Sequence, residues 1–477
     1  MVKFGQKLSQ IKRKLRKIDS ASEKEKIVIT PKKEPMLYNA VNMDINNKCN
    51  QRCFFCFNSF WDDSVNMDEE TFARVLKVLP YVQDNVGGGY GFYLSCIYEP
   101  TIHPLFLKFL SMLPEEGKNK VFFTTNLARP MDENFINCML DANIKLINIS
   151  IHTLNSKRFE DIVKSKKFNN FKNNLDLLEK CINEKDSDIP TLRFITMFLK
   201  ENKDEVVDLI KYCQKHFPIE SHEIRTPYLM GNNIEMNKDQ YMPYEEIKNI
   251  VSELKSLDYP IDMDIKSVED LELIENENSN VVEKINGNDI YSEAKKRLSV
   301  VEDKEYLYLR IISKGECMDN KSCVLEDIPA ENPAKFFKDK LFDLYRNKAR
   351  AAYCYNYSES SEIILGNGPI FIDYLVENDA YLELSGWCCP DRKVNTDKLI
   401  IKITGDNGDI HYFYTSTRKR HDADTFKEKE KGWCGGYTTY IEKDILKDNL
   451  YSVDLLYEND LGKIISYSSD NIIKLNS

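Results

Sequence analysis

The sequence predicts an α/β protein whose main part is a partial, TIM-like (β/α)6 barrel. A small α+β auxiliary domain and an all-β sandwich follow it. Three observations predict this order. Apolar strand-like runs alternate with amphipathic helical stretches over residues 37–265. A further strand and helix lie within residues 301–358. Residues 361–477 then hold only short strand-like runs separated by turn signals.

The composition narrows the functional classes. The chain has 477 residues, 42% of them hydrophobic, and a formal net charge of −11. This acidity disfavours a general nucleic-acid-binding role. No apolar run approaches the roughly 18–20 residues that cross a bilayer, and the N-terminus lacks the apolar core of a secretory signal. The thirteen cysteines, odd in number and unevenly spread, fit a reducing compartment, so we expect a cytoplasmic protein.

The first 36 residues are expected to form a basic amphipathic helix and a linker. Residues 2–18 place apolar side chains at helical spacing beside a run of lysines and arginines. Such a helix suits peripheral contact with an anionic membrane, docking on a partner, or a patch of its own barrel. Residues 20–35, charged and bounded by prolines, read as the linker.

The predicted barrel repeats a strand followed by a helix. Strands are expected at residues 37–45, 90–96, 120–126, 146–152, 190–198 and 222–229. Helices are expected at residues 68–79, 104–112, 132–141, 169–183 and 204–216. Such alternation favours a parallel sheet with crossover helices, and six units are too few for a closed eight-stranded barrel. A helix at 244–257 and a strand at 261–265 would finish the core.

Three cysteines follow the first strand. Cys49, Cys53 and Cys56 are separated by three and then two residues. Three thiolates can hold three corners of a 4Fe-4S cube and leave the fourth iron open to a cofactor or substrate. The alternative is a zinc knuckle completed by a distant Cys or His. Chemistry in βα barrels lies at the carboxyl ends of the strands, where this motif falls.

The motif resembles the radical S-adenosylmethionine (SAM) superfamily, and three later stretches extend the resemblance. Residues 95–104 end the second strand and contain Glu99-Pro100, like the family's Gly-Gly-Glu-Pro block. Residues 124–126, Thr-Thr-Asn, close the third strand, and residues 149–152, Ile-Ser-Ile-His, close the fourth. The resemblance covers about residues 37–233, and a zinc knuckle explains none of these three stretches.

The resemblance implies two cofactors, SAM and a 4Fe-4S cluster, and a reductant such as flavodoxin or ferredoxin. Reductive cleavage of SAM would yield a radical that abstracts a hydrogen atom from substrate carbon. Glu99 would accept hydrogen bonds from the SAM amino group, and Ser150 would face its carboxylate or ribose. Asn126 would face the ribose, Phe55 the adenine side, and Lys164 the carboxylate. Each polar residue could instead cap a strand end. No general acid or base is identified.

The auxiliary domain at residues 301–358 follows a linker at 266–300. Its strand at 306–312, its helix at 332–351, and Cys317, Cys323 and Cys354 resemble the SPASM or twitch domains of many radical SAM enzymes. Those domains normally end in a Cys-x-x-Cys pair, and Cys354 has no second member. The three cysteines could hold a second iron-sulfur cluster, or the domain could keep its fold without one.

The predicted sandwich at residues 361–477 resembles, weakly, modules that accompany polysaccharide-assembly glycosyltransferases. Trp387 and Trp433 could stack on sugar rings or anchor the core. We therefore expect a radical SAM enzyme acting on a carbohydrate or nucleotide-sugar by epimerisation, elimination or dehydrogenation, and so an oxidoreductase or isomerase. A peptide substrate is the alternative, and a non-catalytic binding or scaffold protein is the other class.

Overall fold

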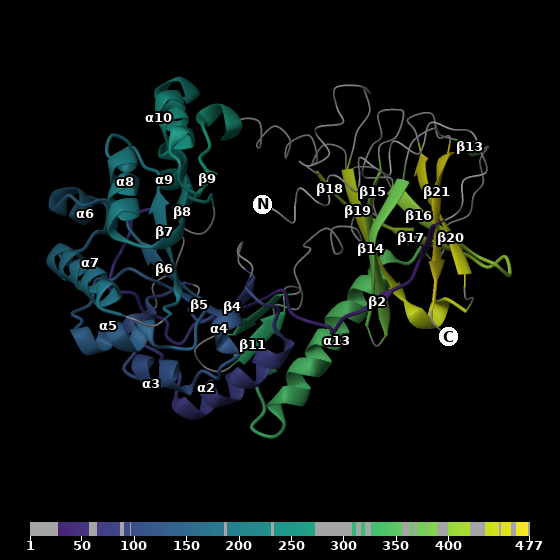
Figure 1. Ribbon diagram of the computed structural model, residues 1–477, viewed down its shortest axis with the longest axis horizontal. Coiled ribbons are helices and arrows are strands. Elements are labelled where there is room, and N and C mark those ends of the chain that lie inside the picture. The colour runs from purple at the N-terminus through teal and green to yellow at the C-terminus, as the bar shows by residue number, and fades with distance from the viewer. Residues whose placement is uncertain are drawn as a thin grey trace. The chain divides into compact units, whose positions relative to one another are not determined.

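The structure is a computed structural model that describes most of the chain. The described residues are 27–56, 64–85, 90–95, 97–185, 188–229, 233–271, 308–311, 316–319, 326–354, 363–365, 370–378, 380–388, 399–419, 435–447, 450–458 and 464–475. They divide into two compact units (Figure 1). The first, here the core unit, takes in described residues between 37 and 341, and the second, here the C-terminal β unit, takes in residues 27–36 and those from 342 onward. The basic segment at residues 2–18 lies outside the described residues.

The core unit is built on a ten-stranded sheet. Its order is β12-β11-β10-β3-β4-β5-β6-β7-β8-β9, and β3 to β9 pair in parallel in chain order. These strands are β3 (Ala40–Met43), β4 (Gly91–Tyr93), β5 (Val121–Thr125), β6 (Leu146–Ser150), β7 (Thr191–Met197), β8 (Ile219–Arg225) and β9 (Ile261–Asp264). The predicted parallel sheet is confirmed. Its parallel strands include β9, which is formed by the residues that the sequence predicted would finish the core. They also include Tyr308–Ile311, which the sequence placed in the auxiliary domain.

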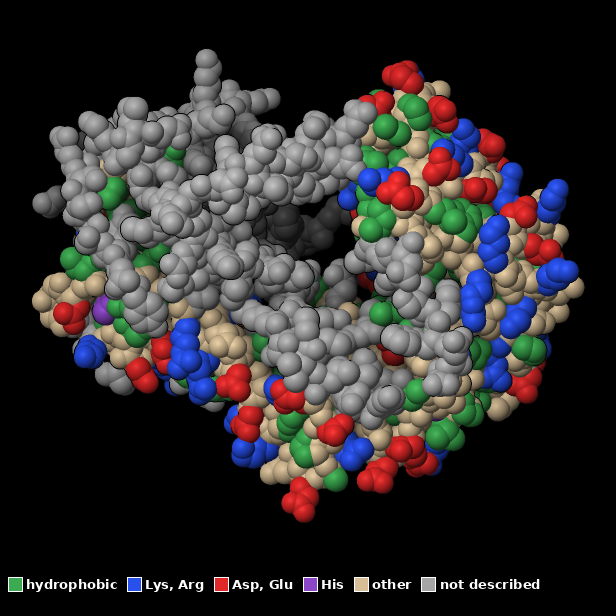
Figure 2. Space-filling model, turned by 180° about the vertical axis from the view of Figure 1, so that it is seen from behind, with side chains coloured by type: hydrophobic (Ala, Val, Ile, Leu, Met, Phe, Trp, Pro, Cys, Tyr) green, Lys and Arg blue, Asp and Glu red, His purple; other side chains and the backbone are tan. Residues whose placement is uncertain are grey.

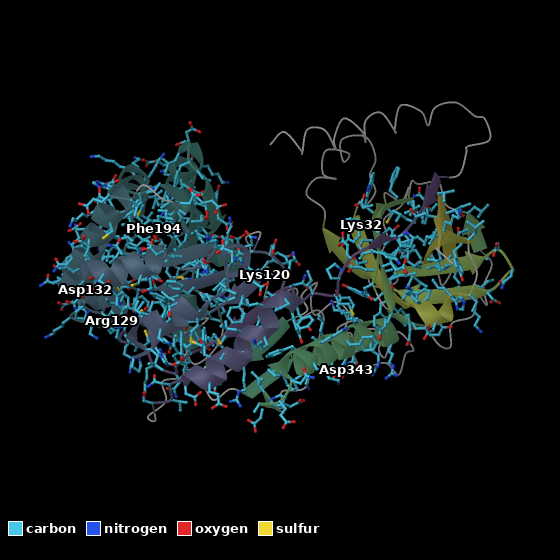
Figure 3. The ribbon with its side chains drawn as sticks, turned by 60° about the horizontal axis from the view of Figure 1, so that its bottom comes forward. Lys32, Lys120, Arg129, Asp132, Phe194 and Asp343 are labelled. Atoms are coloured by element: carbon cyan, nitrogen blue, oxygen red, sulfur yellow. The ribbon has the colours of Figure 1, made fainter. Side chains whose placement is uncertain are left out.

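Helices connect the strands. They are α2 (Glu69–Val75), α3 (Phe106–Met112), α4 (Gly117–Lys120), α5 (Glu133–Leu140), α6 (Ser156–Val163), α7 (Phe168–Asn183), α8 (Val206–His216), α9 (Ile234–Asp239) and α10 (Tyr244–Ser256), with 3-10 turns η1 (Leu76–Tyr81) and η2 (Pro100–Ile102). Asp68, Asp132 and Asn155 begin α2, α5 and α6 by accepting a backbone N–H with their side chains. Asp132 lies near Arg129 in Figure 3. The sequence did not predict α4, α6 or α9.

The helices bury one face against the sheet. In α7 the buried Phe171, Leu175, Leu178 and Ile182 recur at intervals of three and four residues, which places them on one stripe. Aromatic pairs also join neighbouring helices, as where Phe72 of α2 stacks on Phe109 of α3 with ring centroids 4.1 Å apart. On the face shown in Figure 2, acidic and basic side chains are interspersed over the outer surface. Among the described residues, no helix is long and apolar enough to cross a membrane.

The strands expected in a separate auxiliary domain belong to the core sheet instead. β10 (Tyr308–Ile311) pairs in parallel with β3, β11 (Glu316–Asp319) pairs with β10, and β12 (Glu326–Asp327) pairs with β11. Helix α13 (Pro333–Ala352) follows, and Tyr38 donates a 2.8 Å hydrogen bond to the carbonyl of Phe337. The predicted boundary at residues 301–358 is therefore wrong, since a strand that pairs with β3 continues the core.

The C-terminal β unit contains two sheets that share one apolar core. One runs β1-β21-β20-β16-β17, with β13 (Ile363–Leu365) also on β21, and the other runs β18-β19-β15-β14-β2. The strands are β14 (Ile370–Glu377), β15 (Tyr381–Cys388), β16 (Leu399–Gly405), β17 (Ile410–Tyr414), β18 (Ser416–Lys419), β19 (Gly435–Glu442), β20 (Leu450–Glu458) and β21 (Ile464–Lys474). Leu384 of one sheet and Ile401 of the other are both fully buried in the shared core.

Part of the predicted linker is instead structured in this unit. β1 (Ile27–Ile29) pairs in parallel with β21 of one sheet, and β2 (Lys32–Lys33) pairs in parallel with β14 of the other (Figure 1). Pro31 between them is buried. An Ile-Val-Ile run favours an extended strand. The edge of β21 offers unpaired backbone groups to this run, and the edge of β14 offers them to β2. The expectation that residues 20–35 form a linker is therefore wrong for residues 27–33.

Candidate functional site

The three cysteines lie on an irregular loop after β3. Its backbone is held on one side by the last turn of α6, where Arg52 N donates to Val163 O at 2.9 Å and Phe54 N to Ile162 O at 3.2 Å. The last carbonyls of a helix lack partners within the helix, so they are available to such donors. Cys56 N donates to Cys53 O at 3.0 Å and closes a tight turn between two of the cysteines.

The other side of this loop faces α9. Asn233 Nδ2 donates to the carbonyls of Phe54 at 3.0 Å and Cys56 at 2.6 Å. Asn237 Nδ2 donates to the carbonyl of Phe55 at 3.1 Å and to that of Tyr228 at 2.8 Å. The segment from Cys49 to Cys56, here the cysteine loop, is thus held between two helices that follow different strands. No motif marked these asparagines in the sequence.

Glu99 lies in the loop that follows β4, where it begins η2, and it is 3% exposed. Its Oε1 accepts hydrogen bonds from Thr101 N at 3.2 Å, Thr101 Oγ1 at 2.6 Å and Thr125 Oγ1 at 2.8 Å, and its Oε2 accepts one from Asn126 N at 2.7 Å. Asn46 Nδ2 also donates to its carbonyl at 3.0 Å. The carboxylate therefore ties the loop after β4 to the end of β5. Oε2 retains room for a further donor, since a carboxylate has about four acceptor positions.

The electrostatic setting of Glu99 is mixed. Burial raises the pKa of this carboxyl, while the hydrogen bonds from Thr101, Asn126 and Thr125 lower it. Burial also raises the pKa of Cys49 to about 12, and the nearby charge of Glu99 adds to that effect. The pKa of Cys53 is raised by burial and then by Cys49 and Cys56. A positively charged metal centre would stabilise the thiolates that these surroundings disfavour.

Asn126 joins Glu99 to the cysteine loop. Besides the bond from its backbone to Glu99, its Nδ2 lies 2.8 Å from Asn50 Oδ1 and 3.7 Å from Cys49 Sγ. The turn that follows is fixed by Leu127, a buried residue with φ of 51°, whose carbonyl accepts from Asn174 Nδ2 at 2.7 Å. A left-handed leucine costs free energy and persists where the surroundings hold it. The structure thus brings together Cys49, Glu99 and Asn126, which the sequence had placed on successive strand ends.

The other predicted cofactor residues lie around this centre. Ser150 ends β6, half-buried. Phe55 packs edge-to-face on His152 with ring centroids 5.1 Å apart. Lys164 ends α6 with φ of 51°, and its ammonium lies 5.8 Å from the centroid of the Phe54 ring. His152, which ends the 149–152 stretch but was given no role from the sequence, accepts from Met197 N at 3.2 Å, and burial lowers its pKa to about 4.

The donor set of the cysteine loop fits an iron-sulfur cluster. Three thiols from eight consecutive residues lie within electrostatic reach of one another. Beside Cys49, the buried Asn50 Nδ2 has no hydrogen-bond partner among the described residues, so it can donate to a group placed there. Among those same residues, no three His, Cys, Asp or Glu side chains converge on a point as ligands of a single ion do. A 4Fe-4S cube binds each thiolate at a different iron, so its ligands need not converge.

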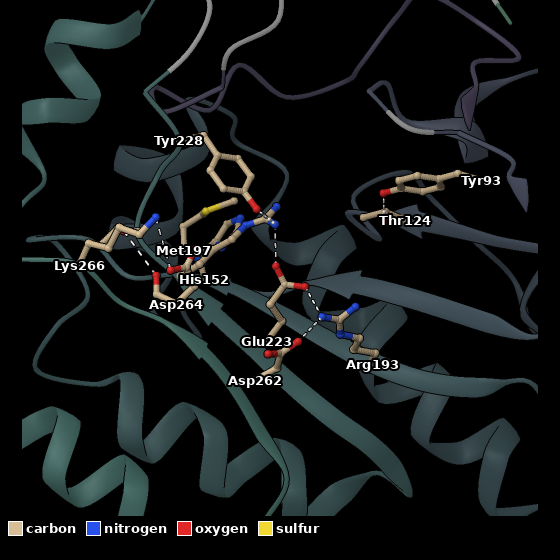
Figure 4. Close-up of polar contacts among 12 residues, drawn as sticks. Tyr93, Thr124, His152, Arg193, Met197, Glu223, Tyr228, Asp262, Asp264 and Lys266 are labelled. Carbon is tan, nitrogen blue, oxygen red and sulfur yellow. Dashed lines mark hydrogen bonds and ion pairs between the residues drawn. The ribbon is translucent and has the colours of Figure 1, made fainter. Parts of the chain in front are cut away.

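A network of charged side chains spans β7, β8 and β9 (Figure 4). Arg193 forms ion pairs with Glu223 and, at 2.9 Å, with Asp262. Arg225 forms a 2.6 Å pair with Glu223 and a 2.8 Å hydrogen bond to the hydroxyl of Tyr228. These five residues are here the charged network. It approaches the cysteine loop through His152, whose pKa is also lowered by Arg225.

Several polar atoms near the network are unsatisfied. Asn148 faces Arg193 in the register of β6 and β7, and it is 3% exposed. Asn148 Oδ1, Arg193 Nε and Arg225 Nε are buried without a hydrogen-bond partner among the described residues. Buried polar atoms are normally paired, and groups of unpaired ones call for an explanation such as a missing ligand or water.

The cysteines predicted for a second cluster are placed differently. Cys317 lies in β11 of the core unit, and Cys323 lies outside the described residues. Cys354 belongs to the C-terminal β unit and is buried in an apolar cluster with Ile400, Leu456 and Ile464. These surroundings explain a buried thiol without a metal.

The two tryptophans were predicted either to stack on sugar rings or to anchor the core. Trp387 is 7% exposed and stacks on Phe371 with centroids 4.3 Å apart, a position that fits a core anchor. Trp433 lies outside the described residues.

Comparison with known families assigns part of the chain. Residues 43–213 match the family described as the Radical SAM superfamily. This part of the chain is therefore a radical SAM domain, and it contains every predicted residue of the cluster and SAM sites except those of the auxiliary domain. Members of this superfamily use SAM and a 4Fe-4S cluster, which the cysteine loop fits.

Solved structures show distant likeness. Streptococcus suis SuiB bound to S-adenosylmethionine is 13% identical with a TM-score of 0.40, covering 64% of this chain and 65% of that one. BtrN in complex with AdoMet and 2-DOIA is 16% identical with a TM-score of 0.21, covering 27% of this chain and 52% of that one. Methylornithine synthase (PylB) is 11% identical with a TM-score of 0.30, and the likeness covers 48% of this chain and 72% of that one. The chain thus spans less than two thirds of the first two. No curated protein shows a significant sequence match.

Proposed function

We propose that this chain is a radical SAM enzyme that abstracts a hydrogen atom from a carbon of a carbohydrate or nucleotide-sugar. The proposal is carried by one observation: the Glu99 carboxylate, in the loop after β4, binds the backbone of Asn126, which in turn contacts Cys49 of the cysteine loop. A structural zinc knuckle gives no reason for a buried carboxylate beside the thiols, whereas a site for a cofactor with an amino group does.

Each residue has a defined task in this proposal. Cys49, Cys53 and Cys56 would hold a 4Fe-4S cluster and leave one iron for the amino and carboxylate groups of SAM. When bound, the cluster supplies the electron for reductive cleavage of SAM and thus the radical that takes the hydrogen atom. Glu99 Oε2 would accept from the SAM amino group. Asn126 would orient the cluster side of the site through its contacts to Asn50 and Cys49.

The surroundings of the centre serve to exclude water. Phe55 and His152 form an aromatic contact, and both are at most 9% exposed. Excluding water protects a reactive radical from side reactions. The lowered pKa of His152 keeps its ring neutral at pH 7, so it adds no charge beside the cationic sulfonium of SAM. Ser150 and Lys164 are proposed for the SAM carboxylate or ribose, on the resemblance described above.

The charged network favours a polar substrate. Its two arginines and two carboxylates balance in charge and are fixed by mutual ion pairs. Fixed donors and acceptors of this kind suit pairs of hydroxyl groups, and the ring of Tyr228, 41% exposed, offers an apolar face beside them. This supports a sugar over an apolar substrate. Epimerisation, elimination and dehydrogenation all begin with the same abstraction, and a peptide substrate remains the second candidate.

The test is anaerobic reconstitution with iron and sulfide, followed by reduction with dithionite or with flavodoxin or ferredoxin. We expect about four irons per chain and release of 5′-deoxyadenosine from SAM, both lost in Cys53→Ala. Stimulation of that release by UDP-glucose or UDP-N-acetylglucosamine, but not by an unstructured peptide, would support the sugar assignment. Full iron loading without any 5′-deoxyadenosine release would instead indicate a scaffold protein on a radical SAM fold.

A further inference from the structure

Two side chains of one short helix bind three consecutive carbonyls of the cysteine loop. Asn233 and Asn237 are four residues apart, so they lie on the same face of the chain entering and forming α9. Together they donate to the carbonyls of Phe54, Phe55 and Cys56. These carbonyls span the backbone that connects Cys53 to Cys56.

The orientation of both amides follows from their partners. Each Nδ2 is shared by two carbonyl oxygens, and a carbonyl can only accept. Turning either amide over would place its oxygen against those carbonyls. Asn237 is fully buried, and its Oδ1 has no partner among the described residues. The two N–H donors of Asn237 are therefore the part of its side chain that bonds to the surrounding backbone.

Hydrogen bonds within the cysteine loop and hydrogen bonds to its neighbours both fix its backbone. Within the loop, Cys56 N donates to Cys53 O, and Arg52 Nη1 donates to the carbonyls of Cys49 and Gln51. The N–H groups of Arg52 and Phe54 are held on the α6 side, and the carbonyls of Phe54 to Cys56 on the α9 side. Hydrogen bonds to α6 on one side and to the two asparagines on the other therefore hold the segment that carries Cys53 and Cys56.

We propose that Asn233 and Asn237 are positioning residues that fix the separation and direction of the Cys53 and Cys56 thiols before a cluster binds. The inference rests on the proposed role of these thiols as iron ligands. Outer groups that orient metal ligands typically change metal affinity or activity by about 10- to 100-fold when removed. Such a role also couples the cluster site to the segment after β8, because Asn237 binds Tyr228 of the charged network as well.

The experiment compares Asn233→Ala and Asn237→Ala with Asn143→Ala in the full-length protein. Asn143 is a matched control, since its Nδ2 also donates to a backbone carbonyl, that of Leu113, at 2.9 Å. Hydrogen-deuterium exchange of the iron-free proteins is measured first. We expect the amides of Arg52, Phe54 and Cys56 to exchange about tenfold faster in the two α9 variants and at the wild-type rate in Asn143→Ala.

Iron content and the electron paramagnetic resonance spectrum of the reduced cluster are measured next. We expect weaker iron retention and altered g-values in the α9 variants only. The half-buried Asn233 supplies the decisive variant if Asn237→Ala does not fold. Unchanged loop exchange and spectrum in a folded Asn233→Ala protein would overturn the inference, as would equal effects in Asn143→Ala. If the wild type binds no iron while the exchange effect is seen, the proposed function is wrong. The conclusion that Asn233 and Asn237 position the cysteine loop is then still supported.

Discussion

The backbone nitrogen of Asn126 lies 2.7 Å from Oε2 of Glu99, so the end of β5 is joined to the loop after β4 through a buried carboxylate. Asn126 also contacts Cys49, so one bond network runs from Glu99 to the cysteine loop. Disturbing the acceptor geometry of Glu99 should therefore affect both the fold around it and the cofactor chemistry proposed there.

Thr125→Val tests the link between Glu99 and the end of β5, because threonine and valine side chains have nearly the same volume. The variant removes the hydroxyl that donates to Glu99 Oε1 at 2.8 Å and accepts from Leu127 N at 3.1 Å. We expect the free energy of unfolding to fall by about 1–3 kcal/mol. The hydroxyl also lowers the pKa of Glu99, so its loss should raise that pKa and move the pH dependence of 5′-deoxyadenosine release to higher pH.

Thr439→Val is the control for this change. Thr439 is fully buried in the C-terminal β unit and donates to Tyr414 O at 2.9 Å. Thr439→Val should reduce the free energy of unfolding in urea by a similar amount, and it should leave the pH dependence of 5′-deoxyadenosine release unchanged. A Thr125→Val enzyme with the wild-type pH profile would show that the hydroxyl serves packing alone.

Buried histidines should make the core unit sensitive to acid. Burial lowers the pKa of His152 from 6.5 to about 4, and that of His222 to about 3. The folded state then binds fewer protons than the unfolded state between pH 6.5 and the lowered pKa. The stability that these neutral rings contribute is complete above pH 6.5 and is lost as pH falls. For His152 the loss approaches about 3 kcal/mol near pH 4.

His152→Gln tests this pH dependence. Glutamine can accept from Met197 N but does not titrate. Unfolding in urea at pH 7 and at pH 4.5 should show a smaller loss of stability in the variant than in the wild type. Parallel losses in the two proteins would assign the acid sensitivity to other groups.

The ion pair between Arg193 and Glu223 is mostly buried, with 14% and 13% of the side chains exposed. Arg193→Met removes one of the two arginines that pair with Glu223, and we expect a loss of about 2 kcal/mol in unfolding free energy. The double variant with Glu223→Gln should lose more stability, because it also takes away the carboxylate that pairs with Arg225. The exposed pair of Lys248 and Glu245 gives the comparison, where Lys248→Met should cost under about 1 kcal/mol. Equal costs at the two pairs would contradict the prediction.

The sequence predicts the residues around the cysteine loop better than it predicts the charged network. Cys49, Glu99 and Asn126 stand at strand ends and in recognisable stretches, so periodicity and motif together place them at one edge of the sheet. Arg193, Glu223 and Asp262 lie inside strands, where alternation with apolar residues gives no sign of their mutual pairing. Asn233 and Asn237 act on carbonyls about 180 residues away, a relation that no local pattern records.

Pairing with distant strands also explains the two regions where the predicted boundaries are wrong. The pattern of residues 308–311 predicts a strand but not its partner. These residues pair with β3, which is far away in the sequence, and the local alternation of side chains carries no information about such a pairing. The Ile-Val-Ile run at residues 27–29 is too short to stand out in a charged segment. It becomes a strand because β21 presents an edge to it.

The N-terminal strands should be needed by the C-terminal β unit. Deleting residues 1–35 removes β1 and β2 and exposes the edges of β21 and β14. It also removes Glu34 N as a donor to the carbonyl of Glu377, which is 3.0 Å away. We expect the shortened protein to unfold at a lower temperature in the C-terminal β unit and to associate at higher protein concentration, as exposed edge strands pair with one another. Differential scanning calorimetry and light scattering measure both effects.

A protein lacking only residues 1–26 is the control, since it keeps both strands. It should match the full-length protein in the transition of the C-terminal β unit, while the longer deletion lowers it. If both deletions lower that transition equally, the strands are not the cause. If neither does, β1 and β2 contribute nothing measurable, and residues 27–33 act as the linker that their charge and prolines first indicated.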